Sequence, residues 1–271
     1  MQCCVVMRFS RHRLRRDSLC ESMSRLPPDD VFAGSLPRVF AHRCGGALAP
    51  ENTLAGLRIA AQRGCTAVEF DVMLSADGSP WLIHDETLVR TTNGAGRVCD
   101  AHDVDLAKLD AGLRHHPAFH GEPLPTLRAA ALVCRELGLL ANVEIKPAAG
   151  FEALTGDVVT RQVLELWRGT TLPLLSSFSE TALEAARRVA PQIPIGCLWV
   201  HPPADWLERV NALNAVTLHC SAGAVSDKLL AEAKNAGIPV LCYTVNNRLE
   251  AESLWQRGVA SVFSDRIDCV V

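Results

Sequence analysis

Strand-like and helix-like patterns alternate along most of this chain, and this alternation restricts its fold more than any other feature. Short apolar runs that predict main strands are centred near residues 40, 70, 143, 175, 196, 217, 241 and 261. Amphipathic patterns with helical spacing lie near residues 152–168, 180–189, 204–210, 226–235 and 248–257. Strands that alternate with helices form parallel βα units. Eight such strands favour a (β/α)8 TIM barrel over the alternative, an open doubly wound sheet.

Length and composition agree with one barrel domain, which we expect over residues 38–271. The chain has 271 residues, which is an ordinary length for this fold. A net charge of −3 gives no reason to expect nucleic acid, and no apolar run reaches the roughly 20 residues that a spanning helix needs. Eleven scattered cysteines without paired C-x-x-C motifs are typical of reduced thiols. We therefore expect a cytoplasmic protein without stable membrane insertion, and no pattern indicates its oligomeric state.

The first 37 residues differ in composition from the rest of the chain. They are rich in arginine and poor in acidic residues, a bias that can mark a transit peptide. The arginines of this stretch include Arg8, Arg11, Arg13, Arg15 and Arg16. We favour a disordered leader, or a natural start nearer Met23, and we place no functional residue in this part.

Two predicted strands carry carboxylates on a single face. In residues 68–72 the apolar side chains share one face, so Glu69 and Asp71 share the other. In residues 142–146, Glu144 and a lysine face away from the apolar side chains in the same way. Carboxylates in an apolar setting are costly unless a cation neutralises them. Their oxygens are ligands for Mg²⁺ or Ca²⁺, so the sequence predicts a divalent-cation site if both strands belong to one sheet.

A short hairpin brings a histidine beside these carboxylates. The turn signal Asp77–Gly78 separates two strand-like runs, and the second run ends at His84. The gap is too short for a crossover helix, so we expect an antiparallel arm. This arm places His84 near the level of Asp71. Residues 86–125 are irregular and predict a small insertion after the arm.

Short motifs follow one another in a characteristic order along the chain. They are Ala41-His42-Arg43-Cys44-Gly45-Gly46, Ala49-Pro50-Glu51-Asn52-Thr53, Glu69-Phe70-Asp71-Val72, Asp77-Gly78, His84-Asp85, Thr91-Thr92-Asn93-Gly94, Pro125-Thr126-Leu127, Glu144-Ile145-Lys146 and Tyr243-Thr244-Val245-Asn246. This series resembles the glycerophosphodiester phosphodiesterase family, of the bacterial, cytosolic type, over residues 38–266. The resemblance implies a (β/α)8 barrel that hydrolyses glycerophosphodiesters to glycerol 3-phosphate and an alcohol, with a divalent metal.

The resemblance also implies roles for the polar residues of these motifs. The general acid and base correspond to His42 and His84, and two imidazoles with pKa near 6.5 suit both proton transfers. A cation together with Arg and Lys would withdraw charge from the phosphodiester. Water could attack directly, or a glycerol hydroxyl could first form a cyclic phosphate. The metal ligands correspond to Glu69, Asp71 and Glu144, and the phosphate-binding residues to Arg43 and Lys146.

Further residues of the motifs are expected to support the site or to contact the substrate. They are Glu51, Asn52, Tyr243 and Asn246. Glu51 either orients Arg43 or a metal ligand, or begins a helix with a favourable charge. Cys44 stands where the family usually has glycine; a positive φ would strain it by about 1 kcal/mol or more, and its thiol could narrow the pocket. Tyr243 stands where tryptophan is common, which keeps an aromatic wall and adds a hydroxyl.

Two other functions fit the same scaffold. A related phosphodiesterase could cleave lysophospholipids or phosphoinositides, for which residues 86–125 and 199–206 could form an apolar entrance. A non-catalytic binding protein is the second alternative. It would have no need of both the histidines and the carboxylates, so the sequence favours an enzyme.

Overall fold

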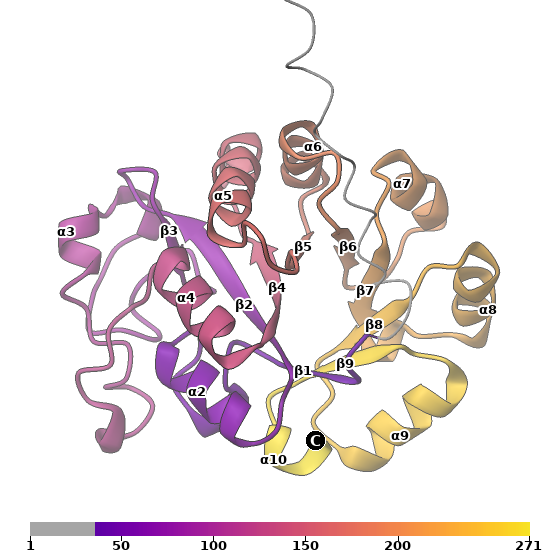
Figure 1. Ribbon diagram of the computed structural model, residues 1–271, viewed down its shortest axis with the longest axis horizontal. Coiled ribbons are helices and arrows are strands. Elements are labelled where there is room, and N and C mark those ends of the chain that lie inside the picture. The colour runs from indigo at the N-terminus through magenta and orange to yellow at the C-terminus, as the bar shows by residue number, and fades with distance from the viewer. Residues whose placement is uncertain (1–35) are drawn as a thin grey trace, which may run out of the picture.

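The computed structural model describes residues 36–271, with a closed barrel at its centre (Figure 1). The first strand, β1 (Val39–Ala41), pairs in parallel with both β2 (Ala67–Leu74) and β9 (Ser261–Ser264), and so closes the sheet. The other parallel strands are β4 (Leu140–Ile145), β5 (Leu174–Ser177), β6 (Ile195–Trp199), β7 (Thr217–Ser221) and β8 (Val240–Tyr243). This closure confirms the (β/α)8 barrel and excludes the open sheet. The expected leader lies mostly outside the described residues.

The predicted arm and insertion are both present. Strand β3 (Pro80–Leu82) runs antiparallel to β2, with Leu82 opposite Val72. The chain then leaves the barrel and returns at α4, and this excursion has a small apolar core of its own that includes Trp81 and Leu106. Its short helices are η2 (Val98–Asp100), α3 (Asp103–Leu106) and η3 (Pro117–Phe119).

Helices follow the strands and cover the outside of the barrel (Figure 1). Thr53 caps α2 (Leu54–Gln62), since its hydroxyl accepts a hydrogen bond from the Gly56 amide at 3.2 Å. Gly237 adopts φ +70° and ends α8, where an L-residue would be strained. The helices are η1 (Gly46–Leu48), α2 (Leu54–Gln62), α4 (Leu127–Leu137), α5 (Glu152–Leu166), α6 (Glu180–Val189), α7 (Trp206–Ala212), η4 (Ala222–Ala224), α8 (Asp227–Ala236), α9 (Arg248–Arg257) and α10 (Ile267–Val270).

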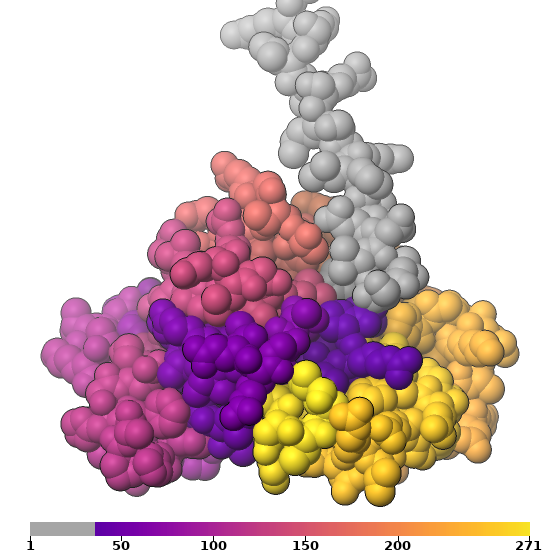
Figure 2. Space-filling view, turned by 60° about the horizontal axis from the view of Figure 1, so that its bottom comes forward, coloured from indigo at the N-terminus to yellow at the C-terminus, as the bar shows by residue number. Residues whose placement is uncertain are grey.

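The main core lies between the strands and this layer of helices. Val68, Phe70 and Val72 of β2 are fully buried in it. Because side chains alternate along a strand, Glu69 and Asp71 point into the barrel. In Figure 2 the first part of the described chain (indigo) lies beside the last part (yellow), as the pairing of β1 with β9 requires. Among residues 36–271, no helix is both long and apolar enough to cross a membrane.

Candidate active site

A cavity of about 250 Å³ opens at the C-terminal ends of the barrel strands. In barrels of this type, that end carries the residues that bind and react. The two predicted histidines and the three predicted metal-binding carboxylates line this cavity, and so does Arg43, whereas Lys146 and Glu51 do not. The lining residues are His42, Arg43, Glu69, Asp71, His84, Asn142, Glu144, Ser176, Phe178, Leu198, His219, Tyr243, Thr244 and Phe263.

Three buried carboxylates form the cavity wall beside β2 and β4. Asp71 and Glu144 are register partners, so neighbouring parallel strands hold their side chains together. One oxygen from each of Glu69, Asp71 and Glu144 lies within 4.8 Å of the other two. Glu69 Oε1 is buried without a hydrogen-bond partner in the described chain. Unpaired carboxylate oxygens gathered in this way fit a hard divalent cation such as Mg²⁺ or Ca²⁺.

Burial and mutual repulsion disfavour the ionised forms of these acids. Burial raises the pKa of Glu144 to about 8, and the charge of Asp71 contributes further to this rise. Burial also raises the pKa of Glu69 well above its usual range, and again Asp71 adds to it. A bound cation would reverse this effect, because it favours the charged carboxylates.

Two cationic side chains flank the carboxylates. The Lys146 Nζ atom lies 3.5 Å from Glu144 Oε1 and 3.7 Å from Asp71 Oδ1. The Arg43 Nε atom lies 3.9 Å from Asp71 Oδ2 and has no hydrogen-bond partner within residues 36–271. The Arg43 backbone amide donates to Glu69 Oε2 at 2.8 Å. Positive charge therefore lies directly beside the buried carboxylates.

A carboxylate that sequence reasoning missed holds the first histidine. Asp265 Oδ1 lies 2.7 Å from His42 Nδ1, so the Nε2 atom faces the cavity, 3.9 Å from Glu69 Oε2. The predicted supporting residue Asn246 holds Asp265 in turn. It accepts from the Asp265 backbone amide at 2.8 Å and donates to its side chain at 3.2 Å. The position of Asp265 directly after the last strand was the only signal for it in the sequence.

The second histidine is held by an ionic chain that begins in the insertion. Asp85 Oδ1 lies 2.7 Å from His84 Nδ1, and burial lowers the pKa of His84. Arg90 donates two hydrogen bonds to Asp85 and two to Glu51. Glu51 also accepts from Arg43 at 3.2 Å. Of the alternatives predicted for Glu51, the contact with Arg43 is present, and Arg90 is a further residue that the sequence analysis missed.

Asn52 supports a carboxylate, whereas Cys44 lies away from the cavity. Asn52 has φ +56° and brackets Asp71, donating to Oδ2 at 2.9 Å and accepting from its backbone amide at 3.0 Å. Cys44 has φ +76°, as the comparison with glycine suggested. Its side chain packs in the main core beside Gly56, and burial raises the pKa of the thiol. The expectation that this thiol could narrow the pocket is wrong, because the thiol lies in the core and does not line the cavity.

Two aromatic side chains form another part of the cavity lining. The rings of Tyr243 and Phe178 meet edge to face, with centroids 6.1 Å apart. The Tyr243 hydroxyl donates to the Trp199 backbone carbonyl at 2.9 Å, which fixes the ring. Phe178 follows β5 and is 46% exposed. It was not singled out in the sequence, where a single Phe after a strand gives no signal.

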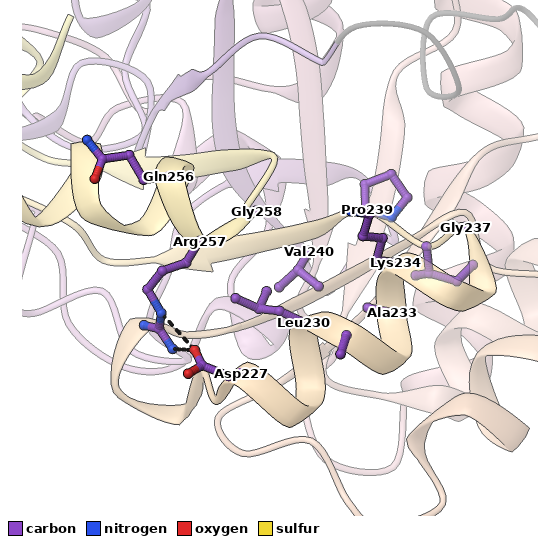
Figure 3. A pocket seen from close by; sticks show the side chains of 12 residues that line it. Asp227, Leu230, Ala233, Lys234, Gly237, Pro239, Val240, Gln256, Arg257 and Gly258 are labelled. Atoms are coloured by element: carbon purple, nitrogen blue, oxygen red, sulfur yellow. Dashed lines mark hydrogen bonds and ion pairs between the residues drawn. The ribbon is translucent and has the colours of Figure 1, made fainter.

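A second hollow, of about 610 Å³, shares no lining residue with this cavity (Figure 3). It is bounded by α8, the end of α9 and the start of β8. Arg257 spans one side and donates to Asp227 at 2.9 Å, so these charges neutralise each other. The cavity with the carboxylates and histidines is therefore the candidate active site.

Comparisons with known proteins agree with the fold. The sequence model of the Glycerophosphoryl diester phosphodiesterase family matches residues 42–269. The glycerophosphodiester phosphodiesterase of Caldanaerobacter subterraneus subsp. tengcongensis is 30% identical over 227 residues, which cover 84% of this chain and 93% of that protein. A phosphodiesterase from Oleispira antarctica, solved with the product sn-glycerol-3-phosphate, has 36% identity and a TM-score of 0.84 over 87% of this chain and 95% of that one. A glycerophosphodiester phosphodiesterase of Agrobacterium tumefaciens has 28% identity and a TM-score of 0.71, over 87% of this chain and 99% of that one.

Proposed function

The chain belongs to the glycerophosphoryl diester phosphodiesterase family, and from this premise we propose that it hydrolyses glycerophosphodiesters to glycerol 3-phosphate and an alcohol, using a divalent cation. The observation that carries the proposal is the buried set of Glu69, Asp71 and Glu144 within 4.8 Å of one another. Two histidines line the same cavity. The Oleispira relative was solved with sn-glycerol-3-phosphate, the product expected here.

The cation site and the basic side chains have complementary tasks. Glu69, Asp71 and Glu144 would hold Mg²⁺ or Ca²⁺, which would supply Lewis-acid chemistry when bound. Arg43 and Lys146 bind the remaining phosphate charge, and each lies within 4 Å of an Asp71 oxygen. Charge that develops in the transition state would thus meet fixed positive groups in a partly buried cavity.

Proton transfer belongs to the two histidines. Each Nδ1 atom lies 2.7 Å from an aspartate, Asp265 for His42 and Asp85 for His84. Such a carboxylate orients the ring and stabilises the imidazolium when it forms. The Nε2 atoms remain for the substrate, one to take the proton of the attacking hydroxyl and the other to protonate the leaving alkoxide.

We also propose that residues 38–271 are one catalytic domain in a reducing compartment such as the cytoplasm. The single domain is supported by the pairing of β1 with β9, which joins the two ends of the described chain. The proposal of a reducing compartment is supported by the eight cysteines of residues 36–271, all of which are free thiols.

The test is release of glycerol 3-phosphate from a panel of glycerophosphodiesters with different alcohols. Exhaustive chelation with EDTA should abolish the release, and Mg²⁺ or Ca²⁺ should restore it. Full activity after chelation would contradict the cation requirement. Release of an alcohol without glycerol 3-phosphate, or preference for lysophospholipid micelles, would contradict the substrate class.

A further inference from the structure

Two buried cysteines lie side by side on neighbouring strands of the barrel. Cys220 of β7 and Cys242 of β8 are register partners. The residues next to them, His219 and Tyr243, line the cavity, so the two cysteines point to the opposite, outward face of the sheet. Both are fully buried there. Neighbouring strands lie about 4.7–4.9 Å apart, within the roughly 4.4–6.8 Å between Cα atoms that a disulfide spans. The pair can therefore be linked without a change of register.

The two thiols also change each other's acidity. A hydrogen bond with Cys242 lowers the pKa of Cys220 against the opposing effect of burial. The same contact raises the pKa of Cys242, which therefore keeps its proton and donates it. Burial alone raises the pKa of Cys134 of α4 to about 12. Because the thiolate is the reactive form of cysteine, Cys220 is the nucleophile of the pair.

The hollow between α8 and α9 leads toward this pair (Figure 3). Val240 lies two residues before Cys242 on the same face of β8, and it lines the hollow together with Leu230 and Ala233 of α8. Helix α8 connects β7 to β8, and these apolar side chains belong to the same core cluster as the pair. A local opening of this layer is enough to admit a molecule little larger than water.

The pair is connected to the cavity through Tyr243. This residue follows Cys242 directly, and its ring lines the cavity. Its hydroxyl donates to the carbonyl of Trp199 at 2.9 Å, and Trp199 is the register partner of Cys220 on the other side. A disulfide holds its sulfur atoms about 2.0 Å apart, far closer than two thiols in contact. Its formation therefore shifts β8 relative to β7, and Tyr243 moves with it.

We propose that Cys220 and Cys242 form a dithiol site that hydrogen peroxide oxidises to a disulfide, and that this disulfide displaces Tyr243 and lowers the activity. The loss of activity rests on the proposed function, whereas the disulfide can form whatever the substrate is. Transient disulfides of this kind are the ones that occur in reducing compartments, where they report on oxidants.

The oxidation takes place in two steps. The Cys220 thiolate attacks one oxygen of hydrogen peroxide, the O–O bond breaks, and hydroxide leaves, so that Cys220 becomes a sulfenic acid. The Cys242 sulfur then attacks the Cys220 sulfur, the S–O bond breaks, and the hydroxyl leaves as water with the proton of Cys242. The hydroxide of the first step takes up the proton that Cys220 had lost. The two thiols are oxidised by two electrons, and the peroxide is reduced to two molecules of water.

The test is made on the full-length protein, reduced and then freed of dithiothreitol. It is treated with hydrogen peroxide, alkylated and digested, and mass spectrometry should find the peptides of Cys220 and Cys242 joined. Release of glycerol 3-phosphate should fall in the same samples, and dithiothreitol should restore it. Cys220→Ala should form no link and keep its activity in peroxide. Cys242→Ala serves the same purpose if Cys220→Ala fails to fold.

A matched control removes another buried cysteine from the outward face of the sheet. Cys197 of β6 has Leu218 as its register partner, so Cys197→Ala should form the link and lose activity as the wild type does. Oxidation of the more exposed Cys99 and Cys269 while the pair stays reduced would overturn the inference. A link that leaves the rate unchanged, or an equal loss of activity in Cys220→Ala, would overturn it as well. If the reduced protein releases no glycerol 3-phosphate, the proposed function fails, and the mass spectrum still decides whether the disulfide forms.

Discussion

Cation binding should release protons from this protein, because the buried carboxylates that would hold the cation have raised pKa values. Burial gives Glu144 a pKa of about 8, so at pH 7 roughly nine-tenths of this side chain is protonated in the cation-free protein. Burial and the charge of Asp71 also raise the pKa of Glu69 well above its usual range. Carboxylates must lose their protons to bind a metal. We therefore expect Glu144 to contribute about one released proton per cation at pH 7.

The same shifts make stability depend on pH and on the cation. Glu144 titrates near 4.5 in the unfolded chain and at about 8 in the folded one, so between these values the folded state binds the extra proton. Stability of the cation-free protein must then fall as pH rises from about 4.5 to 8. The loss from Glu144 alone is about 5 kcal/mol at most, at about 1.4 kcal/mol for each pKa unit. Added cation should offset this loss, most strongly above pH 8.

Titration calorimetry measures the proton number directly. The cation is titrated at pH 7 in two buffers that differ in ionisation enthalpy, and the difference in observed heat gives the protons released. Glu144→Gln should release about one proton fewer. Glu152→Gln, which changes an acid whose pKa is lowered and which stays ionised at pH 7, should leave the number unchanged. Binding without proton release in the wild type, or equal release in Glu144→Gln, would refute the reasoning.

The remaining predictions concern the two histidines and the ionic chain. His42→Ala and His84→Ala should each lower kcat by about 10²-fold or more with little change in cation affinity, and only one of them should be partly rescued on a nitrophenyl ester, whose leaving group needs no acid. Near wild-type rates in both would contradict the acid–base roles, and loss of the cation in both would make the histidines ligands. Arg90→Ala should reduce kcat about 10-fold, because Arg90 holds both Asp85 and Glu51 and positioning is worth less than proton transfer itself. Arg97 is as exposed as Arg90 and pairs only with Glu86 in the described chain, so Arg97→Ala should retain the wild-type rate; equal effects of the two changes would reject a special role for Arg90.

The sequence by itself determined the elements and the direction of many side chains. Periodicity is a property of each segment alone, so the alternation in β2 was enough to send Glu69 and Asp71 to one face. Helices such as α9 (Arg248–Arg257) lie close to where their patterns placed them. The barrel followed from the count and order of strands, because parallel strands need helical crossovers between them. The motifs then indicated the family without any contact being known.

Only the tertiary structure decided which side chains meet. His42 and Asp265 are 223 positions apart, yet their side-chain atoms are 2.7 Å apart because barrel closure joins the first strand to the last. Arg90, in the insertion, contacts Glu51, in the loop after β1, although the two residues are 39 positions apart. The burial that raises the pKa of Glu144 also depends on the whole assembly around it. Spacing along a chain fixes a side chain's direction relative to its own element, but the groups facing it come from other elements, which only the packed barrel brings together.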